Sequence, residues 1–300
     1  MSTDITVVIP TFNQAGFLGE ALSSVLAQDH PHWRAIVVNN HSSDDTRLVV
    51  ERFNDPRIEI IDFANHGVIA ASRNLGIQRT NTEFLAFLDS DDWWMPSKLS
   101  QCLERLSSGV DIVCHAEEWR SESHRRVVRY GPERRVNYRT LLMGGNCLST
   151  SAVIGRTHRF KEVGGFSTNP LFNTAEDYDL WLRLAKLGVR FSFIDDVLGV
   201  FRIHSASASS AIDRNVAAEM AVTDHHLSTA SFSSPRLRRR RLARSHYSAG
   251  RAHHAAGNYK LALRELVFSL RLHPLFPRTF PALFLTFGQT ALRALGRKRR

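Results

Sequence analysis

EFLAFLDSDD, residues 83–92, joins an apolar segment directly to a cluster of acidic residues. Residues 83–88 predict a strand that runs into the acids. Three further apolar runs, at 5–9, 35–38 and 58–61, alternate along the chain with segments of helical periodicity. Such alternation at short spacing is typical of an α/β unit with a largely parallel sheet. We therefore expect the first part of the chain to form such a unit.

Two polar clusters follow predicted strands, Asn39–Asp45 and Asp89–Asp92. Ligands of open α/β sheets bind beyond the carboxyl ends of the strands, where both clusters are expected. The second cluster holds three carboxylates, which repel one another unless a cation or solvent compensates them. Oxygen ligands at this spacing suit Mg²⁺ or Mn²⁺, which bridge carboxylates to diphosphate oxygens. The alternative is a solvated turn that caps the next helix, and the apolar pairs Phe87-Leu88 and Trp93-Trp94 on either side disfavour it.

Two later positions carry further candidate groups. Glu176 and Asp177 precede a strongly helical segment, so they are either acids that favour a helix N-terminus or a carboxylate poised to take a proton from a hydroxyl. Arg202 and His204 follow a predicted strand. They offer a cation and an imidazole that can contact phosphates or complete a metal site, although a lone histidine is more often structural.

Taken in order, six segments resemble those of the inverting family-2 glycosyltransferases with the A-type nucleotide-diphospho-sugar transferase fold. They are Val7–Asn13, Ser72–Ile77, Asp89–Asp92, Val163–Phe166, Glu176-Asp177 and Arg202-x-His204. Each motif is common by itself, but the ordered set is specific, and it covers about residues 4–208. The resemblance implies a Rossmann-like mixed, largely parallel sheet with flanking helices. It also implies transfer of a sugar from a nucleotide-diphosphate donor to an acceptor hydroxyl, with inversion at the anomeric carbon.

The same resemblance implies roles for individual residues. A divalent cation, Mn²⁺ or Mg²⁺, would be held by Asp91, with Asp89 and His204 also near the metal. Asp177 would be the general base, and Glu176 its neighbour near the acceptor. The donor would be bound by residues from five segments: Pro10, Thr11, Asn13, Asn39, Arg73, Asp89, Ser90 and Arg202. Leaving-group charge on a nucleoside diphosphate is what a divalent cation stabilises.

Asn39-Asn40 departs from the family pattern, which commonly has an acidic pair at this place. An asparagine carbonyl can still accept the N3–H of uracil or thymine, and its amide can also donate. We therefore expect a UDP- or dTDP-sugar donor, with base identity left open by this change. Asp44 is expected to keep a structural role in the same loop.

The positive charge of the chain is concentrated in its last part. From Pro235 to Arg300 there are 16 lysines and arginines and a single acidic residue, whereas residues 1–234 hold 23 basic and 28 acidic residues. Arg236–Arg244 (RLRRRRLAR) and the apolar stretch Leu275–Leu295 fit an element lying on anionic lipid. A helix packed on the catalytic domain is the main alternative, and nucleic-acid binding is disfavoured because the tail has no RNA-binding signature.

We expect a catalytic domain over residues 1–208, with a nucleotide-binding half (1–92) and an acceptor-side half (93–208), and a basic helical extension over 209–300. The first residues show no secretory signal and the three cysteines match no disulfide, zinc or redox pattern, so we expect a cytoplasmic protein at the inner face of the membrane. A glycan or lipid-linked acceptor in cell-surface glycan synthesis suits that place.

Two other functions stay open at this stage. A nucleotidyltransferase of related fold would carry a glycine-rich phosphate loop with a lysine, whereas Pro10–Gly19 has two glycines and no lysine. A non-catalytic, nucleotide-sugar-binding scaffold at the membrane draws support from Asn39-Asn40. Retention of Asp91 and Asp177 argues against it.

Overall fold

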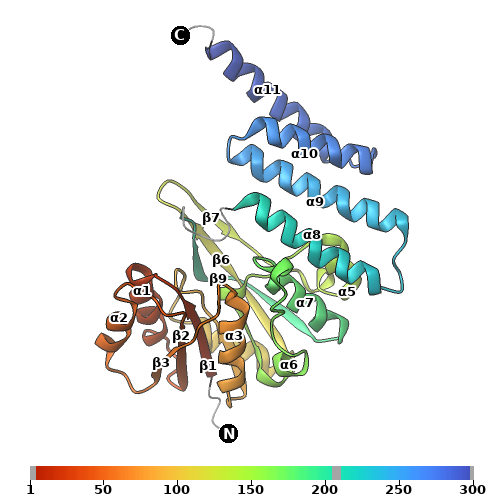
Figure 1. Cartoon of the computed structure of the whole chain (residues 1–300). Coiled ribbons are helices and arrows are strands. Elements are labelled where there is room, and N and C mark those ends of the chain that lie inside the picture. The colour runs from red at the N-terminus through yellow and green to blue at the C-terminus, as the bar shows by residue number, and fades with distance from the viewer. Residues whose placement is uncertain (1–4, 205–210, 298–300) are drawn as a thin grey trace. The chain divides into compact units, whose positions relative to one another are not determined.

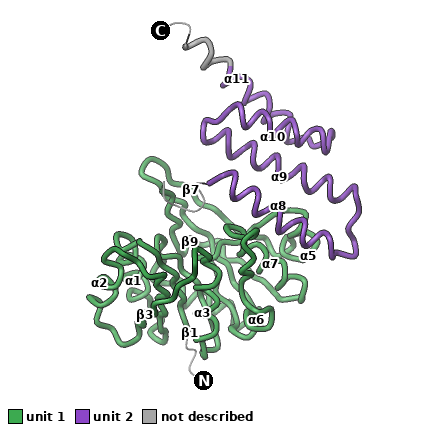
Figure 2. Tube along the Cα trace, viewed as in Figure 1, with its two compact units in different colours: residues 1–205 green, residues 206–300 purple. Residues whose placement is uncertain are grey.

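The structure is a computed structural model of the chain, and it describes residues 5–204 and 211–297, with side chains through residue 290. Two compact units divide the chain, residues 1–205 and 206–300 (Figure 2). The linker expected over Ser205–Ser210 lies outside the described residues.

Unit 1 is built on a sheet of nine strands (Figure 1). The strands are β1 (Ile5–Thr11), β2 (Trp33–Asn39), β3 (Ile58–Asp62), β4 (Phe84–Phe87), β5 (Trp93–Trp94), β6 (Ile112–Arg120), β7 (Arg125–Val128), β8 (Val153–Arg156) and β9 (Phe191–Arg202). Their order is β3-β2-β1-β4-β8-β6-β9-β5, and β7 pairs with β6. Pairing is parallel from β3 to β4 and between β6 and β9, and antiparallel elsewhere. The sheet is therefore mixed and largely parallel, as expected.

Seven helices accompany the sheet: α1 (Ala15–Leu26), α2 (Thr46–Phe53), α3 (Ile69–Arg79), α4 (Lys98–Ser107), α5 (Tyr138–Gly144), α6 (Thr157–Glu162) and α7 (Glu176–Lys186). Side chains alternate across a strand, so β1 serves both faces of the sheet. Ile5, Val7 and Ile9 are fully buried in a cluster that includes residues of α1 and α4. Val8 points the other way, against Gly76 of α3. The two-sided burial explains why β1 reads as an uninterrupted apolar run.

The apolar pattern of the sequence predicts strands over 111–115 and 189–194, and the corresponding strands β6 and β9 are longer than these segments. The acidic pair Asp195-Asp196 interrupts the apolar alternation of β9, and the strand register is irregular there, with Ile194 opposite His115 but Val197 opposite Ala116. The short strands β5, β7 and β8 carry no periodic signal of their own and form because neighbouring strands supply their hydrogen bonds.

Unit 2 is helical, with α8 (Ile212–Thr229), α9 (Pro235–Ala255), α10 (Tyr259–Leu272) and α11 (Thr279–Arg297). The sequence of Tyr247–Leu272 predicts a helix–turn–helix with its turn at Gly257-Asn258, and it corresponds to the end of α9 and to α10. These two helices pack closely, since a Cβ on Gly250 would lie 2.7 Å from a carbon of Leu266. Arg241, inside the basic run, is fully buried and donates to Glu219 and to Ser245 at 2.6 Å each. Among the described residues, no helix has the length and apolar character needed to cross a bilayer.

Gly76 allows α3 to approach β1, because a Cβ there would lie 2.4 Å from Val8 Cγ1. We expect Gly76→Ala to lower the free energy of unfolding by about 1–3 kcal/mol, as overpacking of a tight core does. Gly16→Ala is the matched control, since Gly16 is exposed in α1 with no atom within 4 Å of the added Cβ. It should raise stability by up to about 1 kcal/mol through helix propensity. Urea unfolding of both variants measures the difference; equal effects would contradict the packing argument.

Candidate active site at the carboxyl ends of the strands

Strands β1, β2 and β4 are parallel, so their carboxyl ends meet at one edge of the sheet. Thr11 and Asn39 are in register as the last residues of β1 and β2, and the amide N–H of Asn40 donates to the Thr11 carbonyl at 3.0 Å. Asp89 follows β4 by two residues. The topology therefore brings together the two polar clusters that the sequence placed after strands.

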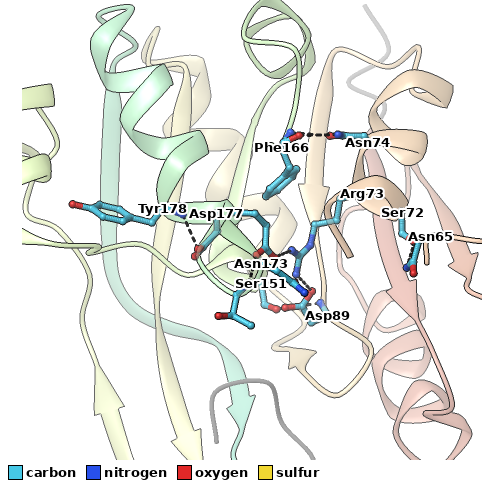
Figure 3. Close-up of polar contacts among 12 residues, drawn as sticks. Asn65, Ser72, Arg73, Asn74, Asp89, Ser151, Phe166, Asn173, Asp177 and Tyr178 are labelled. Carbon is cyan, nitrogen blue, oxygen red and sulfur yellow. Dashed lines mark hydrogen bonds and ion pairs between the residues drawn. The ribbon is translucent and has the colours of Figure 1, made fainter. Parts of the chain in front are cut away.

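Arg73 of α3 lies at the centre of this edge and joins residues far apart in the sequence (Figure 3). Its guanidinium donates to Asp89 Oδ1 at 2.7 Å and to Glu176 Oε1 at 2.8 Å. The side chain is only 4 % exposed. Burial opposes its charge, but Asp89 and Glu176 outweigh burial and raise the pKa of Arg73. The predicted donor-site residues Arg73 and Asp89 are thereby connected to the predicted acceptor-side acid Glu176.

Asp177, at the start of α7, has the electrostatic properties of a base. Its Oδ1 accepts from the amide N–H of Tyr178 at 2.6 Å, and its Oδ2 accepts from Asn146 Nδ2 at 3.0 Å. Burial, followed by the negative charge of Glu176, raises the pKa of Asp177 to about 7. A carboxylate that titrates near neutral pH can both take up a proton and release it, which is what general base catalysis requires.

The acidic cluster after β4 divides into residues with different partners. Asp92 is buried and structural: it accepts from Ser151 Oγ at 2.6 Å and from the amide N–H of Arg202 at 2.8 Å. The Ser151 hydroxyl also accepts from the amide N–H of Asp89 at 3.1 Å. Asp92 thus ties the end of β9 to the loop that carries Asp89 and Asp91.

Asp91 and His204 form the most suitable pair for a divalent cation. Asp91 Oδ2 lies 2.9 Å from His204 Nε2, and each side chain is 17 % exposed. Burial and the neighbouring Asp89 carboxylate raise the pKa of Asp91, an unfavourable charge arrangement that a cation would relieve. In residues 5–204 and 211–297 no three His, Cys, Asp or Glu side chains are grouped to hold a metal alone. A Mg²⁺ or Mn²⁺ ion shared with substrate phosphates needs only one or two carboxylates, so Asp91 and His204 fit it.

Arg202 lies beside this pair but points toward α1. Its Nε donates to the Asp91 carbonyl at 2.9 Å and its Nη2 is ion-paired with Glu20. The guanidinium also lies over the rings of Phe17 and Trp93, at 4.9 Å and 4.5 Å from their centroids. Arg202 therefore fixes the loop that presents Asp91.

Two of the residues predicted to bind the nucleotide, Asn13 and Asn39, form hydrogen bonds within the protein that fix the loops after β1 and β2. Asn39 donates to Asp62 Oδ1 at 2.8 Å and accepts from the amide N–H of Ser42 at 3.1 Å. An aspartate at position 39 would face the Asp62 carboxylate, so Asn39 is explained by Asp62 at the end of β3. Asn13 accepts from the amide N–H of Ser43 at 2.8 Å.

The other predicted donor-site residues lie along the same edge. Pro10 is buried within β1, and Ser90 donates a short hydrogen bond to Gln14. The buried Thr11 hydroxyl has no hydrogen-bond partner among the described residues. Asp44 has the structural role expected of it, accepting from the amide N–H groups of Ala15 and Thr46.

Three residues that support the site carry no sequence signal that singles them out. Asn146 donates to Asp177, Ser151 connects Asp89 with Asp92, and Asp62 pairs with Asn39. Each lies in a segment without a recognisable motif and acquires its role through contacts with residues distant in the chain. For Asp62 the sequence gives one indirect indication: its hydrogen-bond partner, Asn39, stands where the family commonly has an acidic residue.

Comparison with known proteins identifies the family. The family described as Glycosyl transferase family 2 matches residues 6–156. The chain belongs to glycosyl transferase family 2. TuaG of Bacillus subtilis, named as a teichuronic acid biosynthesis glycosyltransferase, is 28% identical over 211 residues, covering 69% of this chain and 81% of TuaG. The beta-1,3-glucosyltransferase WfgD of Escherichia coli is 27% identical over 185 residues, covering 61% of this chain and 70% of WfgD.

Solved structures support the fold of this glycosyltransferase. S. aureus TarS 1-349 in complex with UDP-GlcNAc aligns with a TM-score of 0.67 at 18% identity, over 98% of this chain and 92% of that one. The predicted A-type fold and the predicted family are confirmed. Sugar transfer from a nucleotide-diphosphate sugar is therefore the activity of this chain, and the family match favours it over nucleotide-sugar synthesis.

The pKa of about 7 for Asp177 predicts how the transferase responds to pH. A base must be ionised to act, so kcat/KM should fall about tenfold per pH unit below pH 7. Asp177→Asn should lower the rate at least about 10²-fold while leaving the affinity for UDP unchanged. Asn146→Ala removes a hydrogen bond that lowers this pKa, so it should move the acidic limb to higher pH. An unaltered profile in Asn146→Ala, or a near-native rate in Asp177→Asn, would remove Asp177 from this role.

Proposed function

We propose that this chain is a metal-dependent, inverting glycosyltransferase of cell-surface polysaccharide synthesis that uses a UDP- or dTDP-sugar and a glycan or lipid-linked acceptor. The observation that carries the proposal is the Arg73 bridge. It holds Asp89, beside the cation pair, and Glu176, beside the base, within one hydrogen-bonded group. This bridge supports a site in which donor activation and acceptor deprotonation would occur next to each other.

The chain's own residues account for the binding of the donor. Thr11 offers a buried hydroxyl, and Asp91 with His204 would hold the cation against the diphosphate. When bound, Mn²⁺ or Mg²⁺ supplies positive charge for the departing nucleoside diphosphate. Asp89, held by Arg73 and by the Ser151 hydroxyl, would contact the sugar-proximal part of the donor.

Asp177 would take the proton of the acceptor hydroxyl. The acceptor oxygen then forms a bond to the anomeric carbon while the bond from that carbon to the diphosphate oxygen breaks on the opposite face. One bond forms as one breaks, the proton moves to Asp177, and the configuration inverts. Glu176 accepts from Arg73, and its negative charge, after burial, helps to raise the pKa of Asp177.

Similar proteins support the choice of donor, cation and acceptor. TarS has been solved with UDP and with UDP-GlcNAc, and a mannosyltransferase of Pyrobaculum calidifontis with GDP-Man and Mn²⁺. WfgD is named for glucosyl transfer to a GlcNAc-diphosphoundecaprenol. A lipid-linked diphosphate sugar is therefore the acceptor class that we favour.

Metal dependence is tested at Asp91. We expect UDP to bind this chain more tightly with Mn²⁺ than without it, and Asp91→Asn to abolish both that difference and turnover, because the cation joins protein and diphosphate. Asp195→Asn is the matched control, an exposed acid of β9. Isothermal titration with and without Mn²⁺ measures the effect. Normal Mn²⁺-dependent binding by Asp91→Asn would show that the cation is held elsewhere or not at all.

Unit 2 supports attachment to a membrane surface through the outer face of α11. Phe280, Phe284 and Phe287 recur at helical spacing and are 53%, 80% and 58% exposed. The opposite face of α11 buries Thr279 and Thr286. Aromatic side chains outside and hydroxyls inside reverse the pattern of a helix in water, and lipid is a medium that accepts the aromatic face.

Cations accompany this apolar face. Arg236, Arg239 and Arg240 line one surface pocket together with the residues just before Leu275, which is itself 84% exposed. Anionic lipid headgroups are the complement of such a surface. Arg241 does not belong to it, because it is buried against Glu219. The membrane-facing charge of the basic run therefore lies on its other arginines.

Attachment would have two separable parts. Replacing Phe280, Phe284 and Phe287 by Ser should remove the salt-insensitive part of binding to anionic vesicles. Replacing Arg236, Arg239 and Arg240 by Gln should remove the salt-sensitive part, at about 1 kcal/mol for each charge. Leu171→Ser, an exposed apolar residue of unit 1, is the control. Co-sedimentation at low and high salt measures both parts. Absence of binding by the unaltered chain would contradict the attachment.

A further inference from the structure

The β6–β7 hairpin carries an arginine held face-on over a tryptophan. Trp119 and Arg126 are opposite each other in the strand pairing, so both side chains lie on the same face of the hairpin. The Arg126 guanidinium carbon lies 4.6 Å from the centroid of the Trp119 ring. Arg126 is exposed, and within the described part of the chain no carboxylate lies within ion-pairing distance of it. Its guanidinium therefore contacts the ring and remains accessible to a ligand.

Several contacts fix the tryptophan beneath it. Trp119 Nε1 donates to the Tyr130 hydroxyl at 3.0 Å, and that hydroxyl donates to the buried carboxylate of Glu117. The ring of Phe201 lies against the Trp119 ring, with centroids 4.9 Å apart and an angle of 30° between the planes. The position of Trp119 is thus set by hydrogen bonds at its edge and packing on its face, and it gives Arg126 a rigid support.

Hydrogen bonds link the segment that follows the hairpin to the loop after α5, which in turn contacts the predicted base. Gly131, next to Tyr130, donates its amide N–H to the carbonyl of Cys147 at 3.2 Å. The residue before Cys147 is Asn146, whose side chain donates to Asp177. The segment after the hairpin and Asp177 are therefore held by neighbouring residues of the same loop, on the acceptor-side half of unit 1.

We infer that Arg126, positioned by Trp119, binds a phosphate group of the acceptor. The inference rests on the proposed function and specifies its acceptor as a sugar carried on a phosphate or diphosphate. An exposed guanidinium that rests on an aromatic ring can offer its N–H groups to a ligand, and their fork matches two phosphate oxygens. The donor diphosphate has its own cation pair at Asp91 and His204, so this second phosphate site serves the other substrate.

The opposite face of the hairpin provides a matched control. Arg125 is the next residue, 69% exposed, and lies 3.9 Å from Glu118 on the side away from Trp119. Arg125→Gln and Arg126→Gln remove the same charge from the same hairpin. A difference between the two variants therefore reports the stacked position and not the general positive charge.

The experiment compares two synthetic acceptors that differ only in phosphate: a short-chain alkyl diphosphate of GlcNAc and the corresponding alkyl GlcNAc glycoside. Arg126→Gln should raise KM for the diphosphate acceptor at least about tenfold, as expected for a lost hydrogen bond to a charged group. Its kcat, its KM for the glycoside and its affinity for UDP should stay within about twofold, and Arg125→Gln should resemble the unaltered chain. Trp119→Phe, which keeps a ring under the guanidinium, should retain more of the diphosphate preference than Trp119→Leu.

Binding is measured as well as turnover, so that the inference and the proposed function can fail separately. Titration of the UDP-saturated chain with the alkyl diphosphate of GlcNAc should show binding that Arg126→Gln weakens. Binding without sugar transfer would contradict the proposed function and leave the phosphate site supported. Absence of binding by the unaltered chain, equal effects of Arg125→Gln and Arg126→Gln, or weaker UDP binding in Arg126→Gln would overturn the inference.

Discussion

The site of this glycosyltransferase depends on one buried cation. Arg73 is 4 % exposed and donates to carboxylates that lie 16 positions after it and 103 positions after it. Removal of one partner from a buried ion pair typically costs about 3–5 kcal/mol, because the remaining charge is left without compensation. The arrangement therefore selects one geometry for the strand ends and for the start of α7. Donor-side and acceptor-side groups are positioned by the same side chain.

Around that cation, neighbouring acids take different roles because their surroundings differ. Asp92 is buried and accepts hydrogen bonds from the Ser151 hydroxyl and the amide N–H of Arg202, so its role is structural. Asp91 keeps a partly exposed oxygen beside His204 and suits a cation. Glu176 is ion-paired with Arg73, whereas burial, followed by the charge of Glu176, raises the pKa of the adjacent Asp177 to about 7. Different burial and different partners thus give similar residues distinct properties.

In unit 2, too, the role of a side chain depends on what surrounds it. A run of arginines suggests a uniformly solvated surface, yet Arg241 is fully buried with Glu219 and Ser245 as partners. In α11, Phe280, Phe284 and Phe287 are exposed, whereas Thr279 and Thr286 are buried. A basic, apolar sequence is compatible with either a packed or a lipid-facing helix, and the orientation of each helix decides which side chains remain available to a partner.

The sequence by itself determined the alternating strands and helices of the first half, the family, and the principal site motifs, because apolar periodicity and ordered motifs are local properties of the chain. It identified Asp91, Asp177 and Arg73 as candidates from their motifs. Only the tertiary structure decided which acids already have hydrogen-bond partners, that Asp62 explains Asn39, that Asn146 contacts Asp177, and that Arg126 lies over Trp119. Those properties arise from contacts between distant segments and from burial, neither of which is encoded in local spacing.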